Sequence, residues 1–266
     1  MTLNKLISLR GKKALVTGAT GHLGRVICKT LAELGAEIIM IDQPGSDFKH
    51  IQKYLKKKWN TRSSFYSCDF EYESQRTQMI HDIKLKNRKI SILVNNAAFV
   101  GTSNLPGWSV PFEKQSLETW RRAFEVNLTT PFHLCQAFVQ ELRKGEGGSI
   151  INITSIYGEY GPDWRIYKGT KMGNPAAYSA SKGGLVQFTR WLATTLAPNI
   201  RVNAISPGGI IRDQENKFIS SYKKKTPMAR MGKEIDFQGA LAFLGGKSSS
   251  YVTGQILRVD GGWGVW

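Results

Sequence analysis

Short apolar runs alternate with longer amphipathic segments along nearly the whole chain. The apolar runs are rich in β-branched residues and have the length of strands, whereas the segments between them have the period of surface helices. Strict alternation of strand and helix requires right-handed crossovers, which produce a parallel sheet covered by helices on both faces. The sequence therefore predicts an α/β fold with one doubly wound parallel sheet of about seven strands. The expected strands are residues 13–17, 37–41, 64–68, 90–94, 149–154, 200–205 and 255–259, and the expected helices are residues 23–34, 48–58, 72–86, 117–143, 176–196 and 234–244.

Length and composition favour one domain over residues 1–266, because the chain contains no linker, repeat or low-complexity segment. No run approaches the roughly 20 apolar residues that span a bilayer, and the start of the chain lacks the features of a signal peptide. Cys28, Cys68 and Cys135 are widely spaced and lie in apolar contexts, which predicts buried free thiols rather than a disulfide or metal site. We expect a cytoplasmic protein without a membrane partner.

The chain carries a formal net charge of +17, which raises the question of an anionic partner. The basic residues are dispersed, with small clusters at 53–58 and 223–225. No zinc-finger spacing, RNA-binding aromatic motif or basic zipper accompanies them. We therefore expect solvated surface for most of this charge and no specific nucleic-acid partner, with attraction of an anionic substrate or cofactor as the alternative.

A glycine-rich turn joins the first expected strand directly to the first expected helix. Glycines stand at positions 18, 21 and 24. Glycine permits a tight turn and lets the backbone approach a pyrophosphate, while the start of the helix offers free N–H groups to the phosphates. This strand–turn–helix context predicts a single-domain, Rossmann-like dinucleotide-binding fold.

The second expected strand leads into Asp42, eighteen positions after Gly24. A carboxylate there can accept hydrogen bonds from the adenosine ribose and repels a 2′-phosphate. Gln43 and Pro44 follow, so no adjacent Arg or Lys neutralises such a phosphate. NAD(H) is therefore favoured over NADP(H).

Tyr178 and Lys182 lie four residues apart within an expected helix, which places both side chains on one helix face. An ammonium beside a phenol stabilises the phenolate and so lowers a phenol pKa of about 10 toward the range of a general acid/base. The pattern occurs by chance in many proteins, so its meaning depends on the remaining motifs.

With the glycine loop, this pair makes the sequence resemble the short-chain dehydrogenase/reductase family, chiefly its classical branch, from about residue 11 to residue 262. Asn95-Asn96-Ala97-Ala98 resembles the Asn-Asn-Ala-Gly motif of that family. The resemblance implies four catalytic residues, which are Asn127, Ser155, Tyr178 and Lys182. It also implies a cofactor site formed by Gly18, Thr20, Gly21, His22, Leu23, Gly24, Asp42, Asp69, Phe70, Asn96, Ala97, Ala98, Tyr178, Lys182, Pro207, Gly208 and Ile210.

The resemblance assigns a role to each catalytic residue. Tyr178 is the acid/base that accompanies hydride transfer, and Ser155 stabilises the substrate oxygen. Lys182 lowers the pKa of Tyr178 and holds the nicotinamide ribose, while Asn127 bends its helix and positions a proton-relaying water. The family also implies a homodimer or homotetramer formed through the helices at 117–143 and 176–196.

Two departures from the family pattern lie in the cofactor region. His22 replaces a glycine of the classical loop, and the resulting glycine spacing is similar to that of the extended branch, which contains sugar-nucleotide epimerases and dehydratases. Arg212 replaces a threonine that contacts the carboxamide, and it can instead meet an anionic substrate.

A third departure separates Ser155 from Tyr178 by 23 positions, a longer spacing than is usual in the family. We call residues 159–175 the insertion. Because active-site residues flank it, we expect it to border the substrate, with aromatic faces for sugar rings and cations for phosphate or carboxylate. A surface flap or oligomer contact is the alternative. The candidate substrate residues are Trp164, Arg165, Tyr167, Lys168 and Arg212.

These patterns predict an NAD(H)-dependent oxidoreductase that interconverts a secondary alcohol and a ketone on a polar, anionic or sugar-like small molecule. The insertion also resembles those of family members from bacterial surface-sugar and nonulosonic-acid pathways. Only residues 210–233 are available as a substrate lid, whereas epimerases of the extended branch usually carry a further domain. A sugar-nucleotide epimerase or dehydratase and a non-catalytic nucleotide sensor remain alternatives.

Overall fold

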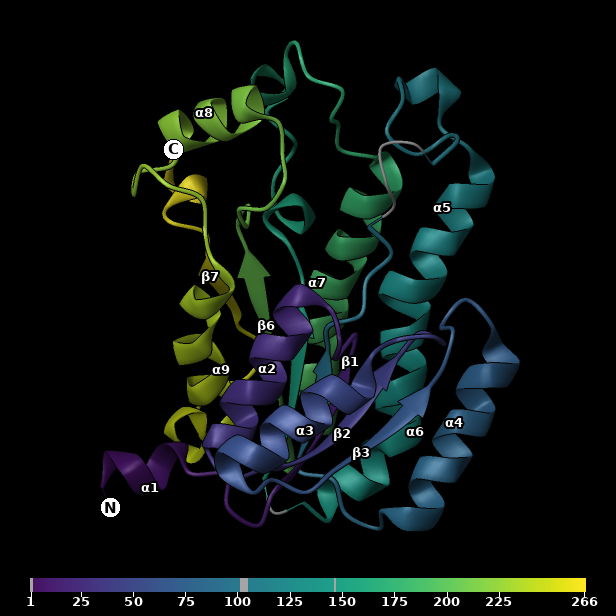
Figure 1. Ribbon diagram of the computed structural model, residues 1–266, viewed down its shortest axis with the longest axis vertical. Helices are drawn as coiled ribbons and strands as arrows, with labels where there is room; N and C mark the ends of the chain where they lie inside the picture. The colour runs from purple at the N-terminus through teal and green to yellow at the C-terminus, as the bar shows by residue number, and fades with distance from the viewer. Residues whose placement is uncertain (1, 101–104, 146) are drawn as a thin grey trace.

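The computed structural model describes residues 2–100, 105–145 and 147–266, and its centre is one seven-stranded parallel sheet (Figure 1). The strand order is β3-β2-β1-β4-β5-β6-β7. The predicted doubly wound parallel sheet is therefore confirmed. The strands are β1 (Lys13–Thr17), β2 (Glu37–Asp42), β3 (Ser63–Ser67), β4 (Ile92–Asn95), β5 (Gly148–Ile153), β6 (Ile200–Pro207) and β7 (Ile256–Val259).

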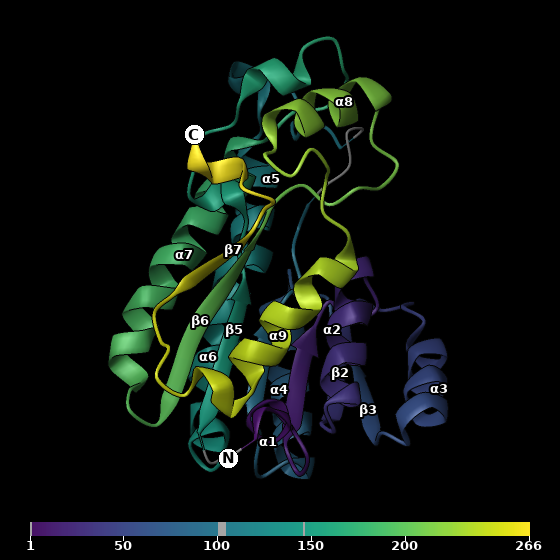
Figure 2. The same cartoon turned by 90° about the vertical axis from the view of Figure 1, so that its left-hand side faces the viewer.

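Helices cover both faces of the sheet (Figures 1 and 2). The face that carries α2, α3 and α9 buries one apolar cluster, and the face that carries α4, α6 and α7 buries another. Burial on both faces explains why the central strands are continuous apolar runs. The helices are α1 (Leu3–Ile7), α2 (His22–Glu33), α3 (Phe48–Trp59), α4 (Glu73–Lys86), α5 (Leu117–Phe124), α6 (Thr130–Arg143), α7 (Ala176–Leu196), α8 (Asn216–Lys225) and α9 (Gln238–Gly245).

The expected helix at 117–143 contains a π-helical turn, Glu125–Thr129, between α5 and α6. This turn inserts one extra residue into the helical ladder, an offset too small to interrupt the helical pattern of the sequence. Two further helices, α1 and α8, lie outside the expected ones, and α8 lies in the predicted lid.

Across the three described ranges, no helix combines the length and apolarity needed to cross a bilayer, and no three His, Cys, Asp or Glu residues gather as potential metal ligands. Cys28, Cys68 and Cys135 are buried and unpaired. The prediction of buried free thiols is confirmed.

The glycine turn allows α2 to start very close to β1. Gly18 has a φ of +61°, a conformation that suits glycine. Gly24, one turn into α2, faces the Gly18 carbonyl so closely that a Cβ there would collide with that oxygen. The two glycines therefore set the packing distance between the first strand and the first helix.

Gly24→Ala should lower the free energy of unfolding by about 1–3 kcal/mol, because overpacking at a backbone contact forces the turn to move. Chemical denaturation measures this loss. Gly239→Ala is the matched control, since nothing lies within 4 Å of its added Cβ in α9. The free energy of unfolding of that control should rise by roughly 0.5–1 kcal/mol, because alanine has a higher helix propensity than glycine. Equal effects of the two substitutions would contradict the packing argument.

Candidate active site

A cavity of about 620 Å³ lies at the carboxyl ends of the strands. Strand order reverses between β1 and β4, so the connections leaving these two strands diverge and open a crevice where such sheets bind ligands. Every residue that the sequence assigns to the cofactor site lines this cavity. Three of the four predicted catalytic residues, Ser155, Tyr178 and Lys182, also line it.

Hydrogen bonds tie the glycine loop to the end of β4. The Thr17 hydroxyl accepts the backbone N–H groups of Asn96 and Ala97, each at 2.9 Å. The Asn96 side-chain amide donates to the carbonyls of Thr17 (2.9 Å) and Gly18 (3.1 Å). The loop is thus held in place, with the amino terminus of α2 available to an anionic group.

Asp42 stands at the end of β2 and faces the same loop. One carboxylate oxygen accepts the Thr20 N–H and hydroxyl, both at 2.7 Å, and the other accepts the Gln43 N–H at 2.8 Å. The carboxylate therefore supports the loop and also places a negative charge at the cavity wall. Together with the space that Gly18 and Gly24 leave free, this donor and acceptor set fits the adenosine half of a dinucleotide.

Tyr178 begins the second half of the site near the start of α7. Burial raises the pKa of Tyr178 above its ordinary value, and a hydrogen bond with Ser155 lowers it in part. Ser155 follows β5 and also accepts the Tyr157 N–H at 3.2 Å. The phenol and the serine hydroxyl therefore lie next to each other in the cavity, where both can form a hydrogen bond with one carbonyl oxygen.

Lys182 is buried one turn after Tyr178 in α7, at 2% exposure. Its ammonium donates to the Ile153 carbonyl at 2.7 Å and lies 5.9 Å from the centre of the Tyr178 ring. Burial lowers the pKa of Lys182 to about 8. Burial is the largest influence on the pKa of the Tyr178 phenol, and the lowering of that pKa by Lys182 stays a prediction.

Asn127 lies in the π-helical turn and is fully buried rather than exposed in the cavity. Its side-chain oxygen accepts the Phe99 N–H at 2.7 Å, and its amide donates to the Ser181 hydroxyl at 3.0 Å. Ser181 precedes Lys182 in α7. Asn127 therefore joins α7 to the segment that follows β4, which fixes the position of the Tyr178–Lys182 pair.

The predicted substrate residues of the insertion do not line the cavity, whereas Arg212 does. Arg165 is 87% exposed and pairs with Asp163 at 2.8 Å. Trp164 and Lys168 are exposed, and Tyr167 is buried behind the cavity wall. The expectation that the insertion cations border the substrate is wrong for Arg165 and Lys168, because spacing from Ser155 cannot show where a side chain ends.

The cavity wall also contains apolar and aromatic residues that were not among the predicted site residues, including Tyr157, Met172, Phe218, Tyr222 and Met231. Three of them carried a usable signal in the sequence. Tyr157 lies only two positions after Ser155, and Phe218 and Tyr222 have the four-residue spacing of one helix face.

Comparison with known proteins decides the family. A family model described as enoyl-(acyl carrier protein) reductase matches residues 18–264. The chain belongs to the short-chain dehydrogenase/reductase family. It is therefore an oxidoreductase of the NAD(P)-dependent kind.

Individual relatives of this dehydrogenase/reductase differ in activity and cofactor. The 3-oxoacyl-(acyl-carrier-protein) reductase of Aquifex aeolicus is 31% identical over 261 residues, covering 96% of this chain and 98% of the relative. A short chain dehydrogenase from Leptospira borgpetersenii with bound NAD+ has 33% identity and a TM-score of 0.84, covering 99% and 97% of the two chains. A gluconate 5-dehydrogenase from Burkholderia cenocepacia, in complex with NADP and tartrate, has 25% identity and a TM-score of 0.86 with full coverage of both chains.

Lys182→Met should stabilise this dehydrogenase/reductase at pH 7. The buried ammonium lowers the free energy of unfolding by about 3 kcal/mol, because its pKa is about 8 in the folded protein instead of 10.5. Removing it recovers this free energy, and the lost hydrogen bond to the Ile153 carbonyl offsets about 1 kcal/mol of the gain. The folded pKa lies below the unfolded one, so the penalty is complete below pH 8 and disappears as the pH rises to 10.5. Urea denaturation of both proteins at pH 7 and pH 10 measures this narrowing gap. A difference in the free energy of unfolding that does not change with pH would contradict a lowered pKa of Lys182.

Proposed function

We propose that this protein is an NAD(H)-dependent oxidoreductase that interconverts a secondary alcohol and a ketone on a polar, anionic or sugar-like small molecule, with Tyr178 as the acid/base. One observation carries the proposal. Ser155, Tyr178 and Lys182 line the same cavity as the glycine loop and Asp42. A dinucleotide seated on that loop has its reactive end within the cavity that holds the proton donor.

Each side chain has a chemical task in the reduction direction. A bound nicotinamide supplies the hydride. Tyr178 gives its phenolic proton to the ketone oxygen as the new C–H bond forms, and Ser155 donates a hydrogen bond to the same oxygen. The Lys182 ammonium stabilises the resulting phenolate, and a proton from water restores the phenol. Oxidation reverses these steps.

Lys182 retains donors for a ligand. An ammonium carries three N–H donors, and among the described residues the Ile153 carbonyl is its one hydrogen-bond acceptor. Because Lys182 lines the cavity, the remaining donors can meet the hydroxyls of a ribose. Asn127 contributes by holding α7 through Ser181.

Asp42 supports the choice of NAD(H). Its carboxylate lines the cavity beside Thr20, and Gln43 and Pro44 follow it without a neutralising cation. A 2′-phosphate placed there meets an uncompensated negative charge. The relatives support either cofactor, since one solved structure holds NAD+ and another NADP.

The cavity favours a substrate with an anionic group on a carbon skeleton of moderate size. Arg212 is the candidate partner of that group because it lines the cavity, and its ion pair with Glu234 at 3.2 Å is a contact that the substrate anion would have to share. The lining also includes aromatic and thioether side chains, among them Tyr157, Phe218 and Met231. The relatives are reductases and dehydrogenases by name, which favours alcohol–ketone chemistry over epimerisation.

We also propose that the protein forms a homodimer or homotetramer and that it is cytoplasmic. Trp120 of α5, Phe132 of α6 and Trp191 of α7 are large apolar side chains with substantial exposure, and such residues favour a protein interface. The buried unpaired cysteines suit a reducing compartment.

The cofactor preference has a direct test. The wild-type protein should bind NADH at least about tenfold more tightly than NADPH, because charge repulsion opposes the 2′-phosphate. Asp42→Asn keeps the shape and removes the charge, so it should narrow this ratio. Fluorescence titration of the reduced nicotinamide measures both affinities. Tighter binding of NADPH by the wild type would refute the argument from Asp42.

Tyr178→Phe tests the chemistry. It should bind NADH within about twofold of wild type yet lose about 10²- to 10⁴-fold in turnover, the usual contribution of a positioned acid/base. Turnover is followed by NADH absorbance on a panel that includes D-gluconate, other hydroxy acids, sugar phosphates, nucleotide sugars and acetoacetyl-coenzyme A. Tyr251→Phe, at a fully exposed tyrosine, is the matched control. Turnover retained by Tyr178→Phe would remove Tyr178 from the acid/base role.

A further inference from the structure

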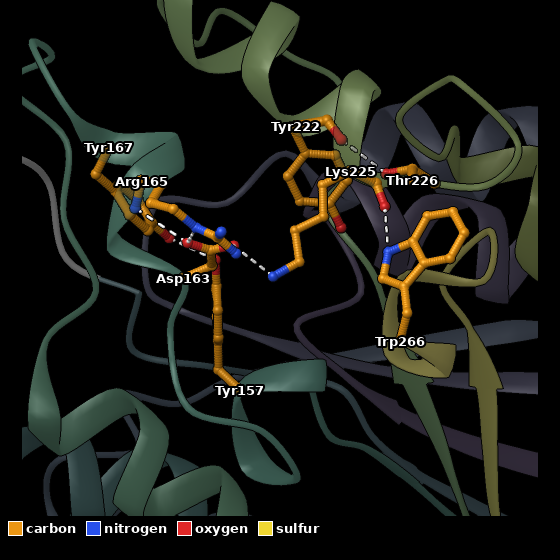
Figure 3. A network of polar contacts seen from close by, with 8 residues as sticks. All are labelled: Tyr157, Asp163, Arg165, Tyr167, Tyr222, Lys225, Thr226 and Trp266. Atoms are coloured by element: carbon orange, nitrogen blue, oxygen red, sulfur yellow. Dashed lines mark hydrogen bonds and ion pairs between the residues drawn. The ribbon is translucent and has the colours of Figure 1, made fainter.

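Tyr157 connects the cavity with the insertion. Its side chain lines the cavity, and its hydroxyl lies 2.6 Å from the hydroxyl of Tyr167, which belongs to the insertion (Figure 3). Its backbone N–H also donates to the Ser155 hydroxyl at 3.2 Å. One residue therefore joins the group that holds the substrate oxygen, the cavity wall and the insertion.

Tyr167 is well placed to fix the Tyr157 ring. It is 8% exposed and does not line the cavity, so it contacts Tyr157 from behind the wall. Burial raises the pKa of Tyr167 to about 12, and burial also raises the pKa of Tyr157. Both hydroxyls stay protonated at neutral pH, which preserves the hydrogen bond. Loss of one hydroxyl leaves its partner buried without that bond.

The insertion itself is held by α8. Asp163 accepts hydrogen bonds from Arg165 and from Lys225, the last residue of α8 (Figure 3). The Tyr167 ring also packs on Phe218 of α8, with ring centres 5.3 Å apart. The guanidinium of Arg165 is therefore occupied by an ion pair within the insertion. The insertion meets the cavity directly at Met172 and contacts the Tyr157 side of the wall through the Tyr167 hydroxyl.

The C-terminal residues brace α8 from the other side. The Lys225 ammonium lies 4.8 Å from the Trp263 ring, and the Trp266 indole donates to the Lys225 carbonyl at 3.0 Å (Figure 3). Tyr222 stacks on Trp263 with ring centres 4.2 Å apart. The wall formed by Tyr157 and the α8 aromatics is thus supported from two directions.

We infer that Tyr157 is a specificity-determining residue whose ring contacts the carbon skeleton of the substrate, and that Tyr167 is the positioning residue through which the insertion acts on it. A ring in this wall favours a flat C–H face, as in a sugar ring or an aliphatic chain, beside the reacting carbon. The inference rests on the proposed function, because it places the substrate next to Ser155 and Tyr178.

The test compares Tyr167→Phe, Tyr157→Phe, Tyr157→Ala and the double Phe variant on the best substrate of the panel. Each single Phe variant should raise KM about two- to tenfold, the range for one lost hydrogen bond, with kcat within about twofold. Tyr157→Ala should raise KM further, because it removes the ring. The double Phe variant should be no worse than either single one, since both remove the same bond. Tyr251→Phe is the matched control.

A second measurement separates this inference from the proposed function. Calorimetry measures binding of the panel compounds to the NADH complex of Tyr178→Phe, with and without Tyr167→Phe, so no turnover is needed. Weaker binding of the compounds by Tyr178→Phe/Tyr167→Phe than by Tyr178→Phe alone supports the inference, provided that NADH affinity and melting temperature are retained. This result would support it even where the proposed chemistry fails. The inference would be overturned by additive effects of Tyr157→Phe and Tyr167→Phe on KM, or by an unchanged KM in these variants. It would also be overturned if the panel compounds did not bind, or bound equally well with and without Tyr167→Phe.

Discussion

The reversal of strand order between β1 and β4 is the constraint on which the whole site depends. Neighbouring parallel strands whose connections diverge leave an opening at their carboxyl ends. In this protein that opening is kept in one shape by Thr17 and Asn96, whose hydrogen bonds join the two strand ends directly. The glycine loop, Asp42 and the Ser155–Tyr178 pair then face one cavity, although they are far apart in the chain.

Much of the fold and of the cofactor half was predictable from sequence, because local backbone demands determine both. A strand buried on both faces must be apolar, and the turn into α2 must contain glycine where a Cβ would collide. The apolar pattern missed the π-helical turn at Asn127, since a one-residue offset leaves a helical pattern on both sides of it, and only the family resemblance implied an irregular helix there. Helix α8 was missed because it is short and mostly polar, with Phe218 and Tyr222 as its buried residues.

The destinations of the insertion side chains were beyond prediction for another reason. Arg165 and Lys168 look like substrate ligands by composition and by their place between Ser155 and Tyr178. Yet Arg165 lies beside a carboxylate two residues away, Asp163, and a nearby opposite charge competes with any ligand for a guanidinium. Spacing along the chain limits which segment approaches the site, whereas side-chain pairing decides which atoms reach it.

The residues predicted to carry the chemistry and those of the aromatic wall lie on different elements of the fold. The four predicted catalytic residues are positioned by the end of β5, by α7 and by the π-helical turn. The aromatic wall is positioned by the insertion and α8. The ion pair between Asp163 and Lys225 couples these two wall segments, which lie on either side of Tyr178 in the sequence. The wall and Ser155 meet at Tyr157, whose backbone N–H donates to the Ser155 hydroxyl. Such a division suits a family whose members carry names as different as an acyl-carrier-protein reductase and a gluconate dehydrogenase.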